Sequence, residues 1–413
     1  MMNMDPMYVM TFAIFAVTYL FLAWGRVPGL HIDRAGIALA GAGGMLAIGS
    51  LSFHEAALSI DMETIALLTG MMILVAYLTI AGMFESLTEY LAKHFRSPHS
   101  LLAAVILVSG VLSALMVNDV VCVAMTPLVF RLCRRLGRHP IPYLIGLSTA
   151  SNVGSVATIT GNPQNIIIGS LSGISYLRFA ERLAPIAIIG LILNYIVVAV
   201  VYRNLLKEEL SPVGSDSSQV RRVHSSMIVK GLIVTLATAI FFVSGFPIAT
   251  VSLVAAAVLM IDRIRPSKIY QRIDWPLLVM FAGLFIVVHA FDVHVVRQWH
   301  LNDWTSSIQY PVVSLSAISL LLSNLVSNVP AVLLLRPMID AMPNPEQSWL
   351  ILAMSSTLAG NLTLLGSVAN LIVAETARRN GLEITFMEYL KVGIVVTLLT
   401  MTAGMVWLFI TAH

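Results

Sequence analysis

Polar side chains interrupt one apolar stretch between residues 151 and 170, and the sequence Gly161-Asn162-Pro163 divides it. Proline is unfavourable inside a helix but fits the first turn, where its missing N–H would have no partner. Asn162 is a favourable N-cap for a helix that begins at Pro163. The pattern predicts a transmembrane helix that ends near Thr160, breaks at Gly161 and restarts. A broken backbone survives at membrane depth only where it is buried in protein or lines a polar cavity, which makes this segment a candidate binding site.

A second polar element, Asn118-Asp119, interrupts the apolar stretch from Leu101 to Phe130. A carboxylate at membrane depth is energetically costly, and such residues usually mark a proton or ion path. Asp119 is therefore the candidate for proton coupling. The alternative is a structural carboxylate that caps the helix following it.

The composition determines which elements must position these residues. Hydrophobic residues make up 58% of the 413 and charged residues only 11%, with a mean hydropathy of +0.88. Soluble domains carry about 25% charged residues, so the sequence predicts an all-α integral membrane protein. A net charge of +3 without a basic stripe argues against nucleic acid as a partner. The sequence has no Walker A motif, and its histidines are scattered outside the polar segments, so we expect a transporter and not an enzyme.

The chain repeats in three blocks, each with a constant register shift. The shifts are 213 (Asp61 to Asp274, Gly70 to Gly283), 210 (Ser113 to Ser323, Asn118 to Asn328, Pro127 to Pro337) and 205 (Thr158 to Thr363, Gly161 to Gly366, Asn162 to Ser367, Asn165 to Asn370). At the 210 shift Asp119 falls on Val329, so the carboxylate has no counterpart. The predicted domains are a first repeat over 1–206 with a hairpin at 99–136 and a broken helix at 141–173, a cytoplasmic linker at 207–226, and a second repeat over 227–413 with a hairpin at 311–339 and a broken helix at 348–374.

The distribution of basic residues predicts the topology. If both hairpins enter the membrane and return, each half has five crossings and the halves are inverted. With the N-terminus outside, 20 of the 24 Lys and Arg residues then lie in the cytoplasm. If both hairpins crossed fully, the basic cluster from Arg131 to Arg138 would move outside. The distribution therefore favours re-entrant hairpins and about ten spanning helices.

Inverted repeats place binding sites at the midplane, where discontinuous helices meet. Helix N-termini there offer N–H groups to an oxyanion or hydroxyl, and exposed carbonyl and amide oxygens can hold a cation. The alternative is that these polar residues only join helices to one another. The candidate substrate- and ion-binding residues are Asn118, Asp119, Thr158, Gly161, Asn162, Asn165, Ser327, Asn328, Thr363, Gly366, Ser367 and Asn370.

Four motifs resemble the ion transporter superfamily that includes ArsB-type arsenite permeases, NhaD sodium/proton antiporters and citrate and dicarboxylate carriers. They are NDVVCVAMTPLV (118–129), ASNVGSVATITGNPQN (150–165), DWPLLVMFAGLFIVV (274–288) and SNVPAVLLLRP (327–337). The resemblance is strongest to ArsB-type and plant silicon-efflux transporters. It implies an inverted-repeat homodimer in the inner (plasma) membrane, in which a transport domain moves as an elevator against a scaffold domain.

The hairpin tips depart from the Ser-Asn-Thr sequence of the dicarboxylate carriers: they read Val117-Asn118-Asp119 and Ser327-Asn328-Val329. We therefore expect export of arsenite or antimonite, as the neutral trihydroxide, in exchange for protons carried by Asp119. Asn118, Asn165, Asn328 and Asn370 would shape the pocket. A cytosolic ATPase subunit as partner stays open, and so does a sodium/proton antiporter or sodium-coupled anion carrier. No cofactor or metal is expected beyond a coupling ion, Na⁺ or H⁺.

Overall fold

The computed structural model describes residues 6–24, 31–208, 224–262, 264–299 and 310–411, and these form helices without strands. The helices of the first half are α1 (Pro6–Trp24), α2 (Arg34–Ala47), α3 (Phe53–Ser59), α4 (Met62–Ala81), α5 (Met83–His94), α6 (Pro98–Leu115), α7 (Asn118–Arg135), α8 (Pro140–Ser155), the 3₁₀ turn η1 (Ile159–Gly161), α9 (Pro163–Ser172), α10 (Tyr176–Val201) and α11 (Arg203–Lys207). Those of the second half are α12 (Ser225–Val243), α13 (Ile248–Met260), α14 (Pro266–Tyr270), α15 (Trp275–His294), the 3₁₀ turn η3 (Val296–Trp299), α17 (Pro311–Val326), α18 (Asn328–Asp340), α19 (Pro345–Ala359), α20 (Val368–Arg379) and α21 (Phe386–Ile410).

Seven of the described helices are long and apolar enough to cross a membrane, and α2, α13 and α17 are shorter apolar helices. Helices α2 and α13 have 14 and 13 residues. They span only about 20 Å, less than the roughly 30 Å hydrocarbon core. Neither helix is therefore long enough to cross the hydrocarbon core by itself. The all-helical membrane fold predicted from the sequence is confirmed.

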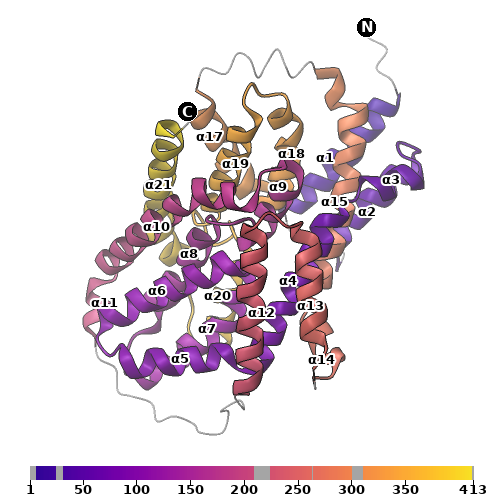
Figure 1. The fold of residues 1–413 in the computed structure, drawn as a ribbon. Coiled ribbons are helices and arrows are strands. Elements are labelled where there is room, and N and C mark those ends of the chain that lie inside the picture. The colour runs from indigo at the N-terminus through magenta and orange to yellow at the C-terminus, as the bar shows by residue number, and fades with distance from the viewer. Residues whose placement is uncertain (1–5, 25–30, 209–223, 263, 300–309, 412–413) are drawn as a thin grey trace.

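Each predicted hairpin is a pair of packed helices, α6 with α7 and α17 with α18. Pro98 and Pro311 begin the first helix of each pair, a position where the missing N–H of proline is harmless. The turns between the helices are Met116-Val117 and Ser327. In Figure 1, α6 and α7 lie near the end of the molecule that holds α5, whereas α17 and α18 lie near the opposite end. The hairpins thus enter from opposite ends.

Both predicted broken helices are present, but the first break begins earlier than predicted. Helix α8 ends at Ser155, not near Thr160, and η1 precedes the restart at Pro163. The Ser155 carbonyl accepts a hydrogen bond from the Asn165 side chain (3.0 Å), which replaces a helical partner. The restarts have the predicted N-caps: Asn162 Oδ1 accepts from the Asn165 N–H, and Ser367 Oγ accepts from the Ala369 N–H.

The helices form two packed groups. The scaffold group consists of α1, α2, α4, α12, α13 and α15, and the hairpin group consists of α6 to α10 and α17 to α21. The Tyr19 hydroxyl of α1 donates to the Pro330 carbonyl of α18 (3.1 Å) across the boundary between them. Each group draws equally on both halves of the chain, so the two repeats are intermixed in both groups.

Glycines bring the two halves together inside the scaffold group. A Cβ on Gly70 of α4 would lie 2.6 Å from the Ser252 backbone of α13, and a Cβ on Gly283 of α15 would lie 2.8 Å from the Ala38 backbone of α2. Gly70 and Gly283 are equivalent at the 213 register shift. The same close helix crossing therefore occurs twice: a glycine of the first repeat packs on the second repeat, and the equivalent glycine of the second repeat packs on the first.

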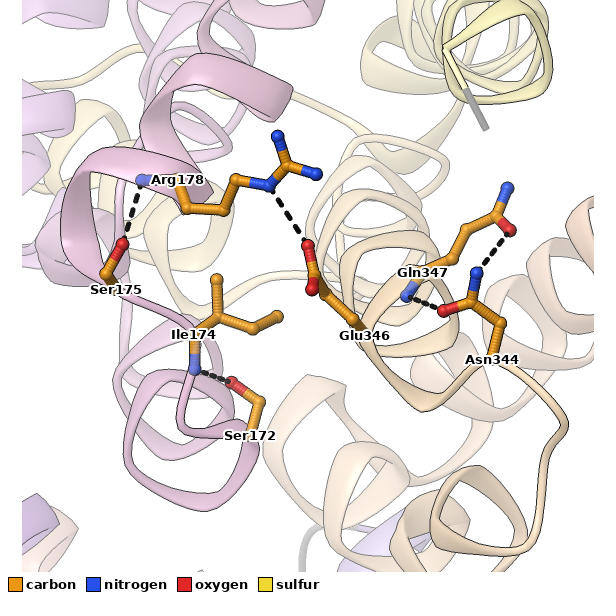
Figure 2. Close-up of polar contacts among 7 residues, drawn as sticks. All are labelled: Ser172, Ile174, Ser175, Arg178, Asn344, Glu346 and Gln347. Carbon is orange, nitrogen blue, oxygen red and sulfur yellow. Dashed lines mark hydrogen bonds and ion pairs between the residues drawn. The ribbon is translucent and has the colours of Figure 1, made fainter. Parts of the chain in front are cut away.

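The hairpin group has a cross-repeat contact at the end where α10 and α19 begin (Figure 2). Arg178 Nε lies 3.1 Å from Glu346 Oε1, and Ser175 and Asn344 cap the two helices. Both charged side chains are about half exposed. An exposed ion pair of this kind contributes at most about 1 kcal/mol, so the buried contacts must hold the repeats together.

We predict that Gly70→Ala and Gly283→Ala each lower the thermal unfolding temperature of the purified protein in detergent. Overpacking against a backbone costs about 1–3 kcal/mol. Gly43→Ala is the matched control, because a Cβ there meets no atom within 4 Å. It should leave the unfolding temperature unchanged or raise it. Equal stability of all three variants would contradict the close crossings.

Candidate functional site

Two asparagine side chains hold the broken backbones in place. Asn165 Nδ2 donates to the carbonyls of Ser155 (3.0 Å) and Thr158 (3.1 Å). Asn370 Nδ2 donates to the carbonyls of Gly360 (2.7 Å) and Thr363 (3.1 Å). These carbonyls lie ten and seven residues before Asn370, the same spacing as in the first break. The two sets coincide at the 205 register shift. Each asparagine side chain thus donates to two backbone carbonyls that have lost their helical N–H partners at the break.

The glycine in each break allows the chain to fold back on the preceding helix. A Cβ on Gly161 would lie 2.2 Å from the Ser155 carbonyl oxygen, and a Cβ on Gly366 would lie 3.0 Å from the Gly360 carbonyl oxygen. The first distance is far inside van der Waals contact, so only glycine fits at Gly161. These glycines shape the loops and carry no ligand-binding atoms of their own side chains.

Each broken helix also binds the other through equivalent residues. At the 205 shift, Asn152 of α8 corresponds to Thr357 of α19. Four of the cross-repeat bonds form two equivalent pairs: Asn152 Nδ2 to Asn370 Oδ1 (3.0 Å) with Thr357 Oγ1 to Asn165 Oδ1 (3.3 Å), and Asn162 Nδ2 to Thr357 Oγ1 (3.1 Å) with Ser367 Oγ to Asn152 Oδ1 (3.1 Å). All of these side chains are buried. The two breaks therefore form one hydrogen-bonded unit at the centre of the hairpin group.

The hairpin tips contact this unit. Asn118 Nδ2 donates to Asn152 Oδ1 (2.9 Å), and Ser151 Oγ donates to the Asn118 carbonyl (3.2 Å). Asn118 and Asn328 are only 4% and 9% exposed. Within the described residues, the side-chain oxygen Oδ1 of each is buried and accepts no hydrogen bond. Buried polar atoms normally have partners. Two equivalent oxygen acceptors are thus available to a ligand.

The tips differ in backbone conformation. Ser327 has φ +78°, ψ 159°, a region that residues with a Cβ rarely adopt, whereas the equivalent Val117 has φ −60°. Such strain costs of order 1–3 kcal/mol and persists only where the surroundings impose it. It lies directly beside Asn328.

A cavity of about 530 Å³ lies between the hairpin tips, the restarted helices and the scaffold group. Both tips and both restarts contribute to its wall, together with the N-terminal ends of α2 and α15. The lining residues are Asp33, Arg34, Ala35, Asn118, Asp119, Pro163, Gln164, Asp274, Pro276, Leu277, Met280, Ser327, Asn328, Val329, Ser367, Val368 and Leu371.

Five of the residues predicted for the site line this cavity: Asn118, Asp119, Ser327, Asn328 and Ser367. The other seven, Thr158, Gly161, Asn162, Asn165, Thr363, Gly366 and Asn370, do not line it. Asn165 and Asn370 use their amide groups on loop carbonyls and cross-repeat bonds, so they act behind the wall. The structure thus separates residues that face a ligand from residues that hold the loops.

Twelve lining residues were not among the predicted ones, and four of these have polar or charged side chains: Asp33, Arg34, Gln164 and Asp274. Gln164 stands one residue after the restart and could have been found from that position. Asp274 caps α15 through the Leu277 N–H, which is the structural role that its place before a span indicates. Asp33 caps α2 in the same way through the Gly36 N–H, and no sequence signal links it to the site.

Charge is unevenly distributed around the cavity. Asp33, Asp119 and Asp274 contribute three carboxylates and Arg34 one guanidinium. Asp119 lies near Asp274, and the Ala369 N–H at the start of α20 faces its carboxylate. A helix N-terminus favours negative charge, which offsets part of the energetic penalty of placing Asp119 here.

The sequence profile of the CitMHS citrate transporter family matches residues 19–359. The chain belongs to this family. Members of the citrate transporter family are transporters, so this chain is a membrane transporter with several apolar spans.

Several known proteins match this chain over nearly its whole length. The silicon efflux transporter LSI3 of Oryza sativa subsp. japonica is 30% identical over 470 residues, with 97% of both chains covered. A transporter of Dictyostelium discoideum named arsB is 27% identical, with 95% of this chain and 91% of that protein covered. The YdaH transporter of Alcanivorax borkumensis has a crystal structure that matches with a TM-score of 0.63 over 98% of both chains. Its sequence identity is 15%, so this match shows a shared fold.

We predict that Asn165→Ala and Asn370→Ala each destabilise the folded protein by about 1–3 kcal/mol, because each leaves buried carbonyls without a donor. Unfolding of the purified protein in detergent measures the effect. Asn380→Ala is the control, since the exposed Asn380 side chain donates only to its own helix. If the variants at 165 and 370 are as stable as the control, these side chains do not hold the breaks.

Proposed function

We propose that the protein is a secondary transporter that exports a small neutral hydroxide, arsenite or antimonite as the trihydroxide, in exchange for protons. The observation that carries this proposal is the cavity shared by Asp119 and the unpartnered oxygens of Asn118 and Asn328. These atoms accept hydrogen bonds, so they suit a ligand that donates several. A trihydroxide supplies three hydroxyl donors without a negative charge that Asp119 would repel.

Exchange follows if one carboxylate serves two ligands. Ionised Asp119 can accept a charge-assisted hydrogen bond from a substrate hydroxyl on either oxygen, and protonation turns one oxygen into a donor and leaves the other a weaker, neutral acceptor. Proton and substrate then compete for the same atom, and each favours release of the other. Competition of this kind couples two opposite fluxes without nucleotide hydrolysis.

The position of the cavity relative to the predicted cytoplasmic side fits export. It is lined by the N-terminal ends of α2 and α15, which follow the predicted cytoplasmic residues Arg26 and Arg272. A substrate would enter there from the cytoplasm of a cell whose plasma membrane holds the protein. Sliding of the hairpin group against the scaffold group would then carry the site across. The names of the LSI3 and arsB relatives agree with a metalloid substrate.

Sodium coupling is the second candidate, and the same orphan oxygens favour it. Amide and carboxylate oxygens are suitable ligands for a hard cation, and Asn118, Asn328 and Asp119 provide them. In this case the protein would be a sodium/proton antiporter or a sodium-coupled anion carrier. Sodium would then raise the thermal stability of the purified protein, while metalloid would have no effect.

We predict that everted membrane vesicles containing the protein accumulate arsenite when a proton gradient is imposed. Accumulation should fall at least about tenfold with a protonophore or with Asp119→Asn, since a contribution of about 1.4 kcal/mol corresponds to a factor of ten. Glu181→Gln is the control, because it removes an exposed carboxylate of α10 outside the cavity. Accumulation that persists in Asp119→Asn and with the protonophore would exclude the proton mechanism.

A further inference from the structure

The two hairpin tips place equivalent residues on the cavity wall, and one equivalent pair differs in charge. Asn118 corresponds to Asn328, and both line the cavity. Gln164 and Ala369 are equivalent at the 205 shift, and each is the second residue of its restarted helix. Asp119 and Val329 also occupy equivalent lining positions, but one is a carboxylate and the other is apolar. The halves thus differ at the residue that faces the helix start.

In one half, the chain supplies its own anion. Helix α7 packs against α20, and the Ala369 N–H, which also donates to Ser367 Oγ (3.2 Å), faces the Asp119 carboxylate. The N-terminus of a helix attracts negative charge through its free N–H groups and its dipole. Asp119 therefore occupies the position that an external anion would take at α20.

In the other half, the equivalent position holds no charge. Helix α18 packs against α9, and Val329 is the counterpart of Asp119. Pro163 has no N–H, and the Asn165 N–H is bound to Asn162 Oδ1. The Gln164 N–H is left at the start of α9, and Gln164 lines the cavity.

The unpartnered oxygens of Asn118 and Asn328 are a second, independent observation that points to a ligand in the cavity. Both side chains are more than nine-tenths buried and line the cavity wall. Oxygen acceptors bind hydroxyl hydrogens and repel carboxylate oxygens. A ligand must therefore bring hydroxyl donors to the two asparagines and one acceptor to the start of α9.

We propose that Asp119 is a built-in anion that determines specificity: it fills the α20 position, so the site accepts neutral hydroxides and rejects carboxylates. This inference rests on the proposed function for the identity of the hydroxide, but not for the rejection of anions. It predicts that the position of one carboxylate, at 119 or at 329, decides the class of ligand. The pair Asp119 and Val329 offers an exchange experiment, because the two side chains have similar size.

The test measures binding of arsenous acid and of citrate to the purified protein at neutral pH, by ligand-dependent thermal stabilisation. The native protein should bind arsenous acid and not citrate. Asp119→Val should bind citrate at least about tenfold more tightly than the native protein, the factor expected when a helix N-terminus gains an anion in a partly buried site. Val329→Asp should bind neither ligand, because both helix starts then face a carboxylate.

The double exchange, Asp119→Val with Val329→Asp, separates specificity from structure. It should again bind arsenous acid and exclude citrate, since it moves the carboxylate to the equivalent half. Restoration would not follow if Asp119 only stabilised the fold. Citrate binding by the native protein, or no gain of citrate binding in Asp119→Val, would overturn the inference. If arsenous acid binds no form but Asp119→Val gains citrate, the proposed substrate fails while the specificity role of Asp119 holds.

Discussion

The requirement that every backbone polar group in a membrane find a partner governs this structure. A transporter needs polar groups at mid-membrane, and a broken helix exposes them, but each freed carbonyl costs several kcal/mol without a donor. Here one asparagine per break satisfies two carbonyls, and the geometry is the same for Asn165 and Asn370. These two side chains satisfy the carbonyls of the breaks, and the N-cap side chains of Asn162 and Ser367 accept from the backbone N–H groups of Asn165 and Ala369 at the restarts.

The same requirement explains why the two repeats interpenetrate. An asparagine that donates to its own loop still has an oxygen that needs a donor, and the other repeat supplies it through Thr357 or Asn152. Neither broken helix is therefore satisfied alone. Because the bonds join the repeats within the hairpin group, this group can move as a body without breaking them.

The sequence predicted the helical membrane fold, the hairpins and the N-caps at the restarts because each depends on local chemistry. Asn162 and Ser367 are cap residues wherever they precede a helix. The end of α8 at Ser155 was missed because it depends on Asn165, which reaches back ten residues. Asp33, Arg34 and Asp274 were missed for a related reason. They belong to the scaffold group, and only its packing against the hairpin tips places them at the cavity.

The cavity combines a symmetric backbone with an asymmetric charge distribution, and this combination suits transport. In the proposed movement of the hairpin group, equivalent packing of the repeats would make the two inverted arrangements similar in packing free energy. The charges are not equivalent: the two glycine crossings make Ala38 of α2 the counterpart of Ser252 of α13, a shift of 214, so Asp33 and Arg34 correspond to Pro247 and Ile248. A hairpin group that slid to the other side would face an apolar pair where it now faces a charged one. A ligand shifts an equilibrium between two conformations only if it binds them with different affinities. The unequal charges of the scaffold wall would give a ligand different affinities for the two positions of the hairpin group.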